Sequence, residues 1–237
     1  MKGIHSQLPL ALFETPRLGF DEFHGTSNRR VRDALKGWAE GDAHWCVNVW
    51  GETGTGKTHL LQAAIRHADQ AGRVAMYLPL REVFSFGPGV LENLEQIEAL
   101  AIDDLDLAVG HEHWEFALFA LYNNCAAAER RWIFATKNRP ANLSLRLADL
   151  QSRLSSALIY QLHDPTDPEK QQILRALAHA RGMELSDAVA SFLMRRLPRS
   201  MATLVAALDT LDSLSLRAAR PLTVPFVREA LALGSDG

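Results

Sequence analysis

The sequence predicts an α/β protein in which a parallel β-sheet, sandwiched by helices, is followed by a small all-helical domain. Two observations lead to this prediction. Apolar stretches typical of strands alternate with stretches typical of helices as far as residue 165, and such alternation favours a buried parallel sheet with helices on both faces. From Asp167 onward, four helical stretches follow one another with no strand between them.

The elements of the expected sheet follow from local patterns in chain order. A loop and an amphipathic helix ending near Gly41 come first, and the apolar start of "HWCVNVWGETGTGKTHLLQAAIRHADQAG" is predicted to be the first strand. A glycine-rich loop comes next, and the helix after it ends at Gly72. The remaining strands are expected in "RVAMYLPL", "QIEALAIDDLDLAV" and "RWIFATKNRP". A helix is expected in "HWEFALFALYNNCAAAE", and "DLQSRLSSALIYQLHDP" is predicted to form a short helix and then the fifth strand.

The C-terminal part has helix signals only. Pro168 and Ser186 are typical of helix starts, and Gly182 is typical of a helix end. We therefore divide the chain into an extended tail (1–17), an α/β core (18–165) and a helical domain (166–237).

Composition excludes several classes of protein. The chain of 237 residues carries 25 Lys and Arg against 28 Asp and Glu, a net charge of −3, so there is no overall basic field to hold nucleic acid. Cys46 and Cys125 lack the spacing of a zinc site or a disulfide framework. The N-terminus has no signal-peptide core, and no apolar run is long enough to span a membrane. We expect a soluble cytoplasmic protein with no membrane partner.

The stretch "GETGTGKT", Gly51 to Thr58, fits the phosphate-loop pattern G-x-x-x-x-G-K-[ST] at every fixed position. It follows a predicted strand and opens a predicted helix, so its backbone N–H groups can surround phosphates at a helix N-terminus. Lys57 is expected to reach the β- and γ-phosphates, and Thr58 to hold Mg²⁺. The predicted ligand is ADP or ATP with Mg²⁺, and the predicted nucleotide-binding residues are Gly51, Thr53, Gly54, Thr55, Gly56, Lys57, Thr58 and His59.

Polar residues at two strand ends complete the expected site. Asp103 and Asp104 follow an apolar strand; Asp103 is predicted to order Mg²⁺ through its water shell, and Asp104 to orient or deprotonate the attacking water. Thr136 and Asn138 lie at the end of another strand, where ligands of open α/β sheets bind. A polar side chain there can touch the γ-phosphate or the attacking water, although a plain turn before Pro140 explains the same residues nearly as well.

Arg153 lies in the short helix before the fifth strand. Taken alone, Arg153 is interpreted as a surface arginine in a salt bridge. In this sequence it follows a phosphate loop, paired aspartates and a polar strand end, and it is therefore a candidate arginine finger that completes the phosphate site of a neighbouring subunit. In this order the chain, over residues 18–235, resembles the AAA+ ATPases with their helical lid. Within them it is similar to the DnaA-related family in "FDEFHGTSN", "GETGTGKTHLLQA", "LAIDDLD", "QSRLSSAL" and "LVAALDTL".

The resemblance implies a regulator of replication initiation. The replication initiator DnaA continues past its lid into a helix-turn-helix module, whereas this sequence ends at Gly237, so we expect no DNA-reading module here. The tail stretch "QLPLAL" resembles the peptides that dock into the DNA polymerase sliding clamp, and the predicted clamp-binding residues are Gln7, Leu8, Leu10 and Leu12. An extended, proline-stiffened peptide loses little entropy on binding. A tail that packs on its own domain is the alternative.

The expected activity is therefore indirect. Tethered to a clamp on DNA, and so associated with the nucleoid, the chain is expected to contact ATP-bound DnaA and to stimulate hydrolysis through Arg153, leaving DnaA in its inactive ADP form. The resemblance to AAA+ proteins implies a lid arginine where this sequence has Ala202, with Arg199 nearly a turn earlier. This departure predicts weak intrinsic ATPase activity or a preference for ADP. A monomer, a homodimer and a higher homo-oligomer are all compatible with the sequence. The alternatives are a DnaC- or IstB-like helicase-loading ATPase, a free-standing ATPase, and a nucleotide-gated adaptor.

Overall fold

A computed structural model describes residues 19–41, 44–218 and 220–232. Within them the strands form one parallel five-stranded sheet in the order β2-β3-β4-β1-β5. The strands are β1 (Cys46–Trp50), β2 (Ala75–Pro79), β3 (Ala99–Asp103), β4 (Arg131–Thr136) and β5 (Leu158–Gln161). The register pairs Val47 with Ile133 and Leu158 on its two sides. The prediction of a parallel sheet is confirmed.

The helices of the described residues alternate with the strands up to β5 and then continue alone. The α-helices are α1 (Arg29–Glu40), α2 (Lys57–Gln70), α3 (Leu80–Val83), α4 (Glu112–Ala127), α5 (Ala148–Ser155), α6 (Asp167–Ala180), α7 (Asp187–Arg196), α8 (Met201–Ala218) and α9 (Val224–Ala230). The short 3-10 helices are η2 (Phe84–Phe86), η3 (Pro88–Leu91), η4 (Leu94–Gln96), η5 (Leu105–Ala108) and η6 (Pro140–Asn142). Those between β2 and β3 have no counterpart in the sequence prediction.

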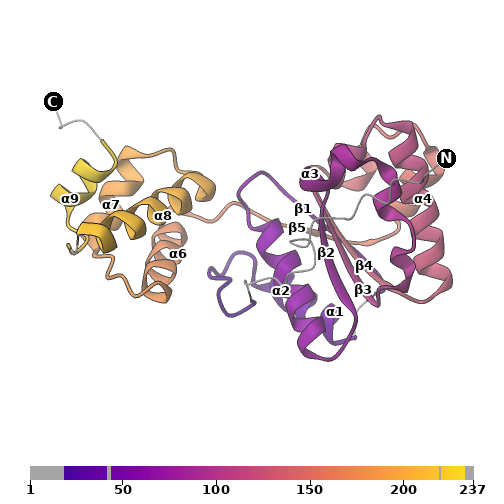
Figure 1. The fold of residues 1–237 in the computed structure, drawn as a ribbon, viewed down its shortest axis with the longest axis horizontal. Helices are drawn as coiled ribbons and strands as arrows, with labels where there is room; N and C mark the ends of the chain where they lie inside the picture. Colours follow the sequence, from indigo (N-terminus) through magenta and orange to yellow (C-terminus); the bar gives the residue numbers. More distant parts are fainter. Residues whose placement is uncertain (1–18, 42–43, 219, 233–237) are drawn as a thin grey trace, which may run out of the picture. The chain divides into compact units, whose positions relative to one another are not determined.

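Helices cover both faces of the sheet (Figure 1). Side chains alternate between the faces along each strand: Val47 and Ile133 pack with α1 and α2, whereas Trp132 and Phe134 pack with α3, α4 and α5. Trp132 and Phe134 are fully buried, and each such side chain stabilises the core by about 1.5–3 kcal/mol. Because both faces are apolar, the strands read as nearly continuous hydrophobic runs.

The described residues form two compact units, of which the second comprises residues 24–29, 53–55 and the chain from His163. In that unit α6 to α9 enclose a core of their own around Leu174, Leu193 and Leu204. The N-terminus of α6 has a capping box in which the side chains of Thr166 and Glu169 each bind the other's backbone N–H. The expectation of a helical lid is confirmed.

Residues 24–29 belong to the helical unit through polar contacts. The carboxylate of Glu169 accepts hydrogen bonds from the backbone N–H and hydroxyl groups of Thr26 and Ser27, at 2.6–2.9 Å. The buried amide of Asn28 donates to the carbonyl oxygen of His163 at 2.8 Å and accepts from its N–H at 2.9 Å. The sequence alone places these residues with the α/β core.

Both cysteines are buried free thiols. Burial raises the pKa of Cys125 to about 12, and it raises the pKa of Cys46 still further. In the described part of the chain, no helix combines the length and the apolar character needed to cross a membrane.

Candidate nucleotide-binding site

The phosphate-binding loop connects β1 to α2, and its backbone conformation requires glycine at Gly56. This residue is the N-cap of α2 with φ of 100°, in the left-handed region, and no side chain caps the helix. A Cβ atom on Gly56 would lie 2.8 Å from Cε2 of Phe23, so any side chain would displace that ring. The N–H groups of the first turn of α2 have no side-chain acceptor at the N-cap, and such groups are what an anionic phosphate binds.

Lys57 places its ammonium group inside the curve of this loop. Its Nζ donates to the carbonyl oxygens of Gly51 at 2.6 Å and Glu52 at 2.9 Å. Burial lowers the pKa of Lys57, and the charge of Asp103 opposes that shift. The lysine therefore supplies a cation at the loop, where a bound phosphate could compete with two carbonyl groups for it.

Asp103 at the end of β3 is the polar centre of the site. It is 2% exposed, and its Oδ2 accepts hydrogen bonds from the hydroxyl groups of Thr58 at 2.6 Å and Tyr77 at 2.8 Å. Burial, and then the charge of Asp103, raise the pKa of Tyr77, so the phenol stays protonated as a donor. The side-chain oxygens of Thr58 and Asp103 lie next to each other, and oxygen atoms are the ligands that Mg²⁺ and Ca²⁺ prefer. Tyr77 is absent from the sequence-based site, because nothing in the local pattern marks it.

The side chain of Asp104 is paired with an arginine, and the residue's backbone N–H donates to Oδ1 of Asp103 at 2.9 Å. Its φ of 53° is in the left-handed region, and its Oδ2 accepts from Nε of Arg81 at 2.9 Å. The hydrogen bond and the charge of Asp104 raise the pKa of Arg81. In this conformation the predicted base is ion-paired, and Arg81 is a second residue that the sequence pattern did not indicate.

The polar end of β4 divides into a buried and an exposed residue. Thr136 is fully buried, and its Oγ1 accepts from Nδ2 of Asn48 at 3.0 Å. Asn138 is exposed, so of the two it is the one accessible to a ligand. Asn48 lies in the middle of β1, and its Oδ1 has no hydrogen-bond partner among the residues that the structure describes. A lone asparagine in an apolar strand was the signal that could have identified this pair.

The remaining predicted loop residues differ in their surroundings. Thr55 is buried at 3% exposure, whereas Thr53 is exposed. His59 lies in the first turn of α2, with Nε2 2.9 Å from the carbonyl oxygen of Gly19 and its ring edge-on to Phe23, at 5.3 Å between centroids. The His59 side chain thus packs on the segment that precedes α1.

Arg153 is exposed on α5, and its Cζ lies 5.7 Å from the centroid of the Tyr122 ring. Among the described residues no carboxylate pairs with it. In the helical unit Ala202 is exposed on α8, and Arg199 binds Asp167 through Nη1 at 2.5 Å. The predicted clamp-binding residues Gln7, Leu8, Leu10 and Leu12 lie outside the described residues.

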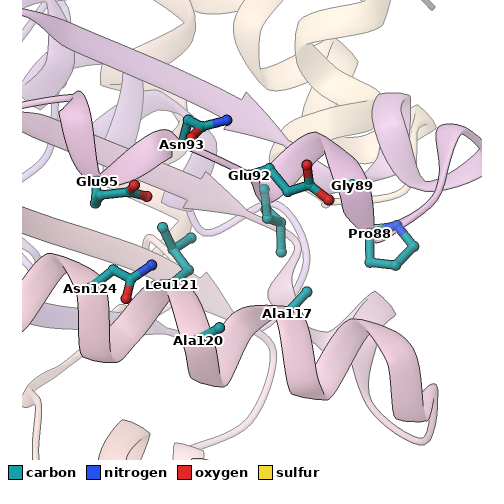
Figure 2. A pocket seen from close by; sticks show the side chains of 10 residues that line it. Pro88, Gly89, Glu92, Asn93, Glu95, Ala117, Ala120, Leu121 and Asn124 are labelled. Carbon is teal, nitrogen blue, oxygen red and sulfur yellow. The ribbon is translucent and has the colours of Figure 1, made fainter. Parts of the chain in front are cut away.

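A separate pocket of about 440 Å³ lies between the 3-10 helices after β2 and helix α4 (Figure 2). It contains none of the predicted site residues. Its lining residues are Pro88, Gly89, Leu91, Glu92, Asn93, Glu95, Ala117, Ala120, Leu121 and Asn124. Elsewhere, among the described residues, no three His, Cys, Asp or Glu side chains are grouped to hold a metal ion.

Comparison with known proteins agrees with this architecture. The family model "Hda, lid domain" matches residues 167–231. A Haemophilus influenzae protein described as an uncharacterized protein is 40% identical over 231 residues, covering 97% of this chain and 100% of that protein.

Solved structures of DnaA share the fold. Domain III of the Thermotoga maritima replication initiation protein DnaA superimposes with a TM-score of 0.79 at 21% identity, covering 90% of this chain and 95% of that one. The replication initiator DnaA bound to AMPPCP and single-stranded DNA gives a TM-score of 0.71 at 21% identity, with coverages of 88% and 70%.

The parallel sheet followed by helices is the fold of DnaA domain III, and the phosphate-loop sequence lies between β1 and α2 of that fold. The chain belongs to the same family as the Haemophilus influenzae protein, and its residues 167–231 match the lid domain of Hda.

Proposed function

We propose that this chain is a negative regulator of replication initiation that docks on the DNA-loaded sliding clamp and stimulates ATP hydrolysis by DnaA. DnaA would be left in its inactive ADP form. The observation that carries this proposal is Arg153, an exposed guanidinium on a DnaA-like module with no carboxylate partner among the described residues. An unpaired arginine keeps its full charge and its N–H donors available for a phosphate.

Arg153 acts on the nucleotide of the partner. The transition state of phosphoryl transfer carries charge on the equatorial oxygens, and an arginine supplied in trans stabilises that charge. The planar guanidinium matches two phosphate oxygens at once, which a lysine cannot do. Such a contact needs only that α5 of this chain face the nucleotide of DnaA.

The chain's own nucleotide is ADP or ATP, held by the residues of the phosphate loop, Gly51 and Thr53 to His59. Mg²⁺, when bound, would be held by Thr58 and Asp103 and would neutralise phosphate charge. Intrinsic turnover is weak, because the predicted base Asp104 is paired with Arg81 at 2.9 Å. Arg199, the nearest substitute for a lid arginine at Ala202, is paired with Asp167. The bound nucleotide then stabilises the fold by mass action.

The clamp is contacted by the tail residues Gln7, Leu8, Leu10 and Leu12. Gln7 anchors the peptide by hydrogen bonds, and each leucine contributes about 1.5–3 kcal/mol if fully desolvated. Tethering to a clamp on DNA raises the local concentration for a weaker contact with DnaA. DNA is reached only through the clamp.

Hydrolysis by DnaA tests the role of Arg153. With loaded clamp present, the intact chain should accelerate release of phosphate from ATP-bound DnaA. Arg153→Ala should return the rate to that of DnaA alone, since an arginine finger contributes on the order of 10³-fold or more. Arg146→Ala, an exposed arginine just before the same helix, is the matched control and should retain stimulation. Full stimulation by Arg153→Ala would refute the proposal.

Two binding measurements test the remaining parts. The intact chain should bind purified sliding clamp in surface plasmon resonance, and the double variant Gln7→Ala, Leu10→Ala should not. Lys57→Ala should lose ADP binding in calorimetry, whereas Lys36→Ala on the exposed face of α1 should keep it. Absence of clamp binding in the intact chain would instead favour a helicase-loading ATPase.

A further inference from the structure

The aromatic ring beneath Arg153 is the feature that this inference uses. The Cζ atom of Arg153 on α5 lies 5.7 Å from the ring centroid of Tyr122 on α4. This distance is within the range in which the negative face of an aromatic ring attracts a cation. The ring is the only interaction partner of the Arg153 side chain among the described residues.

The Tyr122 ring is itself held firmly. It is 5% exposed, with the ring of Trp45 at 5.0 Å and that of Trp132 at 5.7 Å, both near edge-on. Its hydroxyl lies 3.2 Å from Oγ of Ser156, the C-cap of α5. Since Ser156 gives its single hydroxyl proton to the carbonyl oxygen of Arg153 at 2.7 Å, the tyrosine is the donor of the 3.2 Å bond. The ring is therefore fastened to the helix end that carries Arg153.

An aromatic partner differs chemically from the carboxylate that usually pairs with an arginine. A carboxylate would accept the N–H groups and offset the charge, so a phosphate would have to displace it. The ring face attracts the cation as a whole and accepts none of the in-plane N–H donors. The guanidinium can therefore be oriented and still keep its donors for a phosphate, which lowers the entropy lost on binding.

We propose that Tyr122 is a positioning residue that holds the Arg153 guanidinium ready to bind the phosphate groups of a nucleoside triphosphate carried by a partner protein. This inference rests on the proposed function of Arg153. The test therefore combines one measurement on this chain alone with one on the stimulated reaction.

The first measurement is the NMR spectrum of the arginine side chains in the full chain. The Arg153 Hε and Hδ resonances, assigned by their loss in Arg153→Ala, should show an upfield ring-current shift. Tyr122→Phe should retain that shift, because it keeps the ring and removes only the hydroxyl. Tyr122→Leu and Tyr122→Met should lose it. Resonances that are the same in all four proteins would overturn the proposal without any reference to DnaA.

The second measurement is the rate of ATP hydrolysis by DnaA as a function of the concentration of each variant. Tyr122→Met and Tyr122→Leu should lower the maximal rate about two- to fivefold, the strength of one exposed cation–π contact, with the half-saturating concentration unchanged. Tyr122→Phe should restore the maximal rate. In the Arg153→Ala background, the loss of the ring should have no further effect.

The outcomes separate the two proposals. If Arg153→Ala abolishes stimulation but both non-aromatic variants keep the full maximal rate, the positioning role fails and the arginine finger stands. If Arg153→Ala retains stimulation, the proposed function fails and the positioning role with it. If the non-aromatic Tyr122 variants lower the maximal rate while the Arg153 Hε and Hδ resonances keep their shift, the loss has a structural cause and the inference is overturned. Thermal unfolding of each variant identifies any that fails to fold. Leucine and methionine differ in shape, so if one of the two non-aromatic variants does not fold, the other is used for the test.

Discussion

Replacing Glu169 by glutamine tests whether this buried carboxylate holds residues 24–29 to the helical unit. Its Oε1 accepts from the N–H and hydroxyl of Thr26 and from the N–H of Ser27, at 2.8–2.9 Å. Its Oε2 accepts from the hydroxyl of Ser27 and from the N–H and hydroxyl of Thr166, at 2.6–2.9 Å. All six donors are neutral, and Glu169 is 7% exposed.

The magnitude follows from these contacts. A glutamine that keeps its oxygen toward Thr26 turns its NH₂ group toward the N–H of Thr166, so one buried donor loses its acceptor, at a cost of about 1–3 kcal/mol. The remaining bonds lose the assistance of the charge, which roughly doubles the strength of such bonds. Glu169→Gln should therefore lower the free energy of unfolding of the helical unit by about 2–4 kcal/mol.

Urea unfolding followed by circular dichroism measures this difference. With a slope of about 2 kcal/mol per molar urea, the midpoint of the affected transition should fall by about 1–2 M. Glu184→Gln is the matched control, because Glu184 is an exposed glutamate of the same unit, and it should shift the midpoint little. A midpoint for Glu169→Gln equal to that of Glu184→Gln would refute the reasoning.

The pH dependence gives an independent check. Hydrogen bonds from Ser27 and then Thr166 hold the pKa of Glu169 well below its ordinary value of 4.5. A carboxyl group whose pKa is depressed in the folded state contributes stability that is fully present above the unfolded-state pKa. That contribution is lost as the pH falls below about 4.5 toward the folded-state pKa. The wild-type chain should therefore lose more stability than Glu169→Gln between pH 6 and pH 3, and parallel curves would contradict this account.

Two further predictions concern the core and the loop. Gly56→Ala should destabilise the chain by at least about 1–2 kcal/mol and weaken ADP binding, because φ is 100° at this residue and the ring of Phe23 must move. The control is Gly37→Ala on α1, where nothing lies within 4 Å of the new Cβ atom. This variant should stabilise the chain by about 0.5–1 kcal/mol. Equal thermal shifts for the two variants would contradict the role of the backbone. Burial raises the pKa of Cys125 to about 12 and that of Cys46 further. Neither thiol should therefore react with Ellman's reagent at pH 8 until urea unfolds the chain. Rapid labelling of the folded chain would contradict the burial of these thiols.

The local part of the site could be predicted from sequence because its residues are contiguous. The glycines, Lys57 and Thr58 of the phosphate loop lie within eight residues, and their spacing alone requires a strand before them and a helix after them. The alternation of strands and helices is likewise a local property. Helix α7 of the lid begins at a residue whose capping is visible in the sequence, because the hydroxyl of Ser186 accepts from the N–H of Val189 at 3.3 Å.

The partners of the functional side chains could not be predicted in the same way. Tyr77 contacts Asp103 because β2 lies beside β3 in the sheet, with Pro79 opposite Asp103. Asn48 contacts Thr136 because β1 and β4 are neighbours, although 88 residues separate them. No spacing in the sequence encodes such pairs, since strand order is a property of the whole sheet.

What the sequence by itself determined is a set of residue types at fixed spacing: a phosphate-loop pattern after one strand, paired aspartates after another, and a resemblance to the DnaA-related family. Only the tertiary structure decided which of these groups are free to act. It pairs Asp104 with Arg81, pairs Arg199 with Asp167, and places the Arg153 guanidinium over the ring of Tyr122. Whether a charge is neutralised or left available depends on what the fold brings within a few ångströms of it, and that distance is set by packing between elements far apart in the chain.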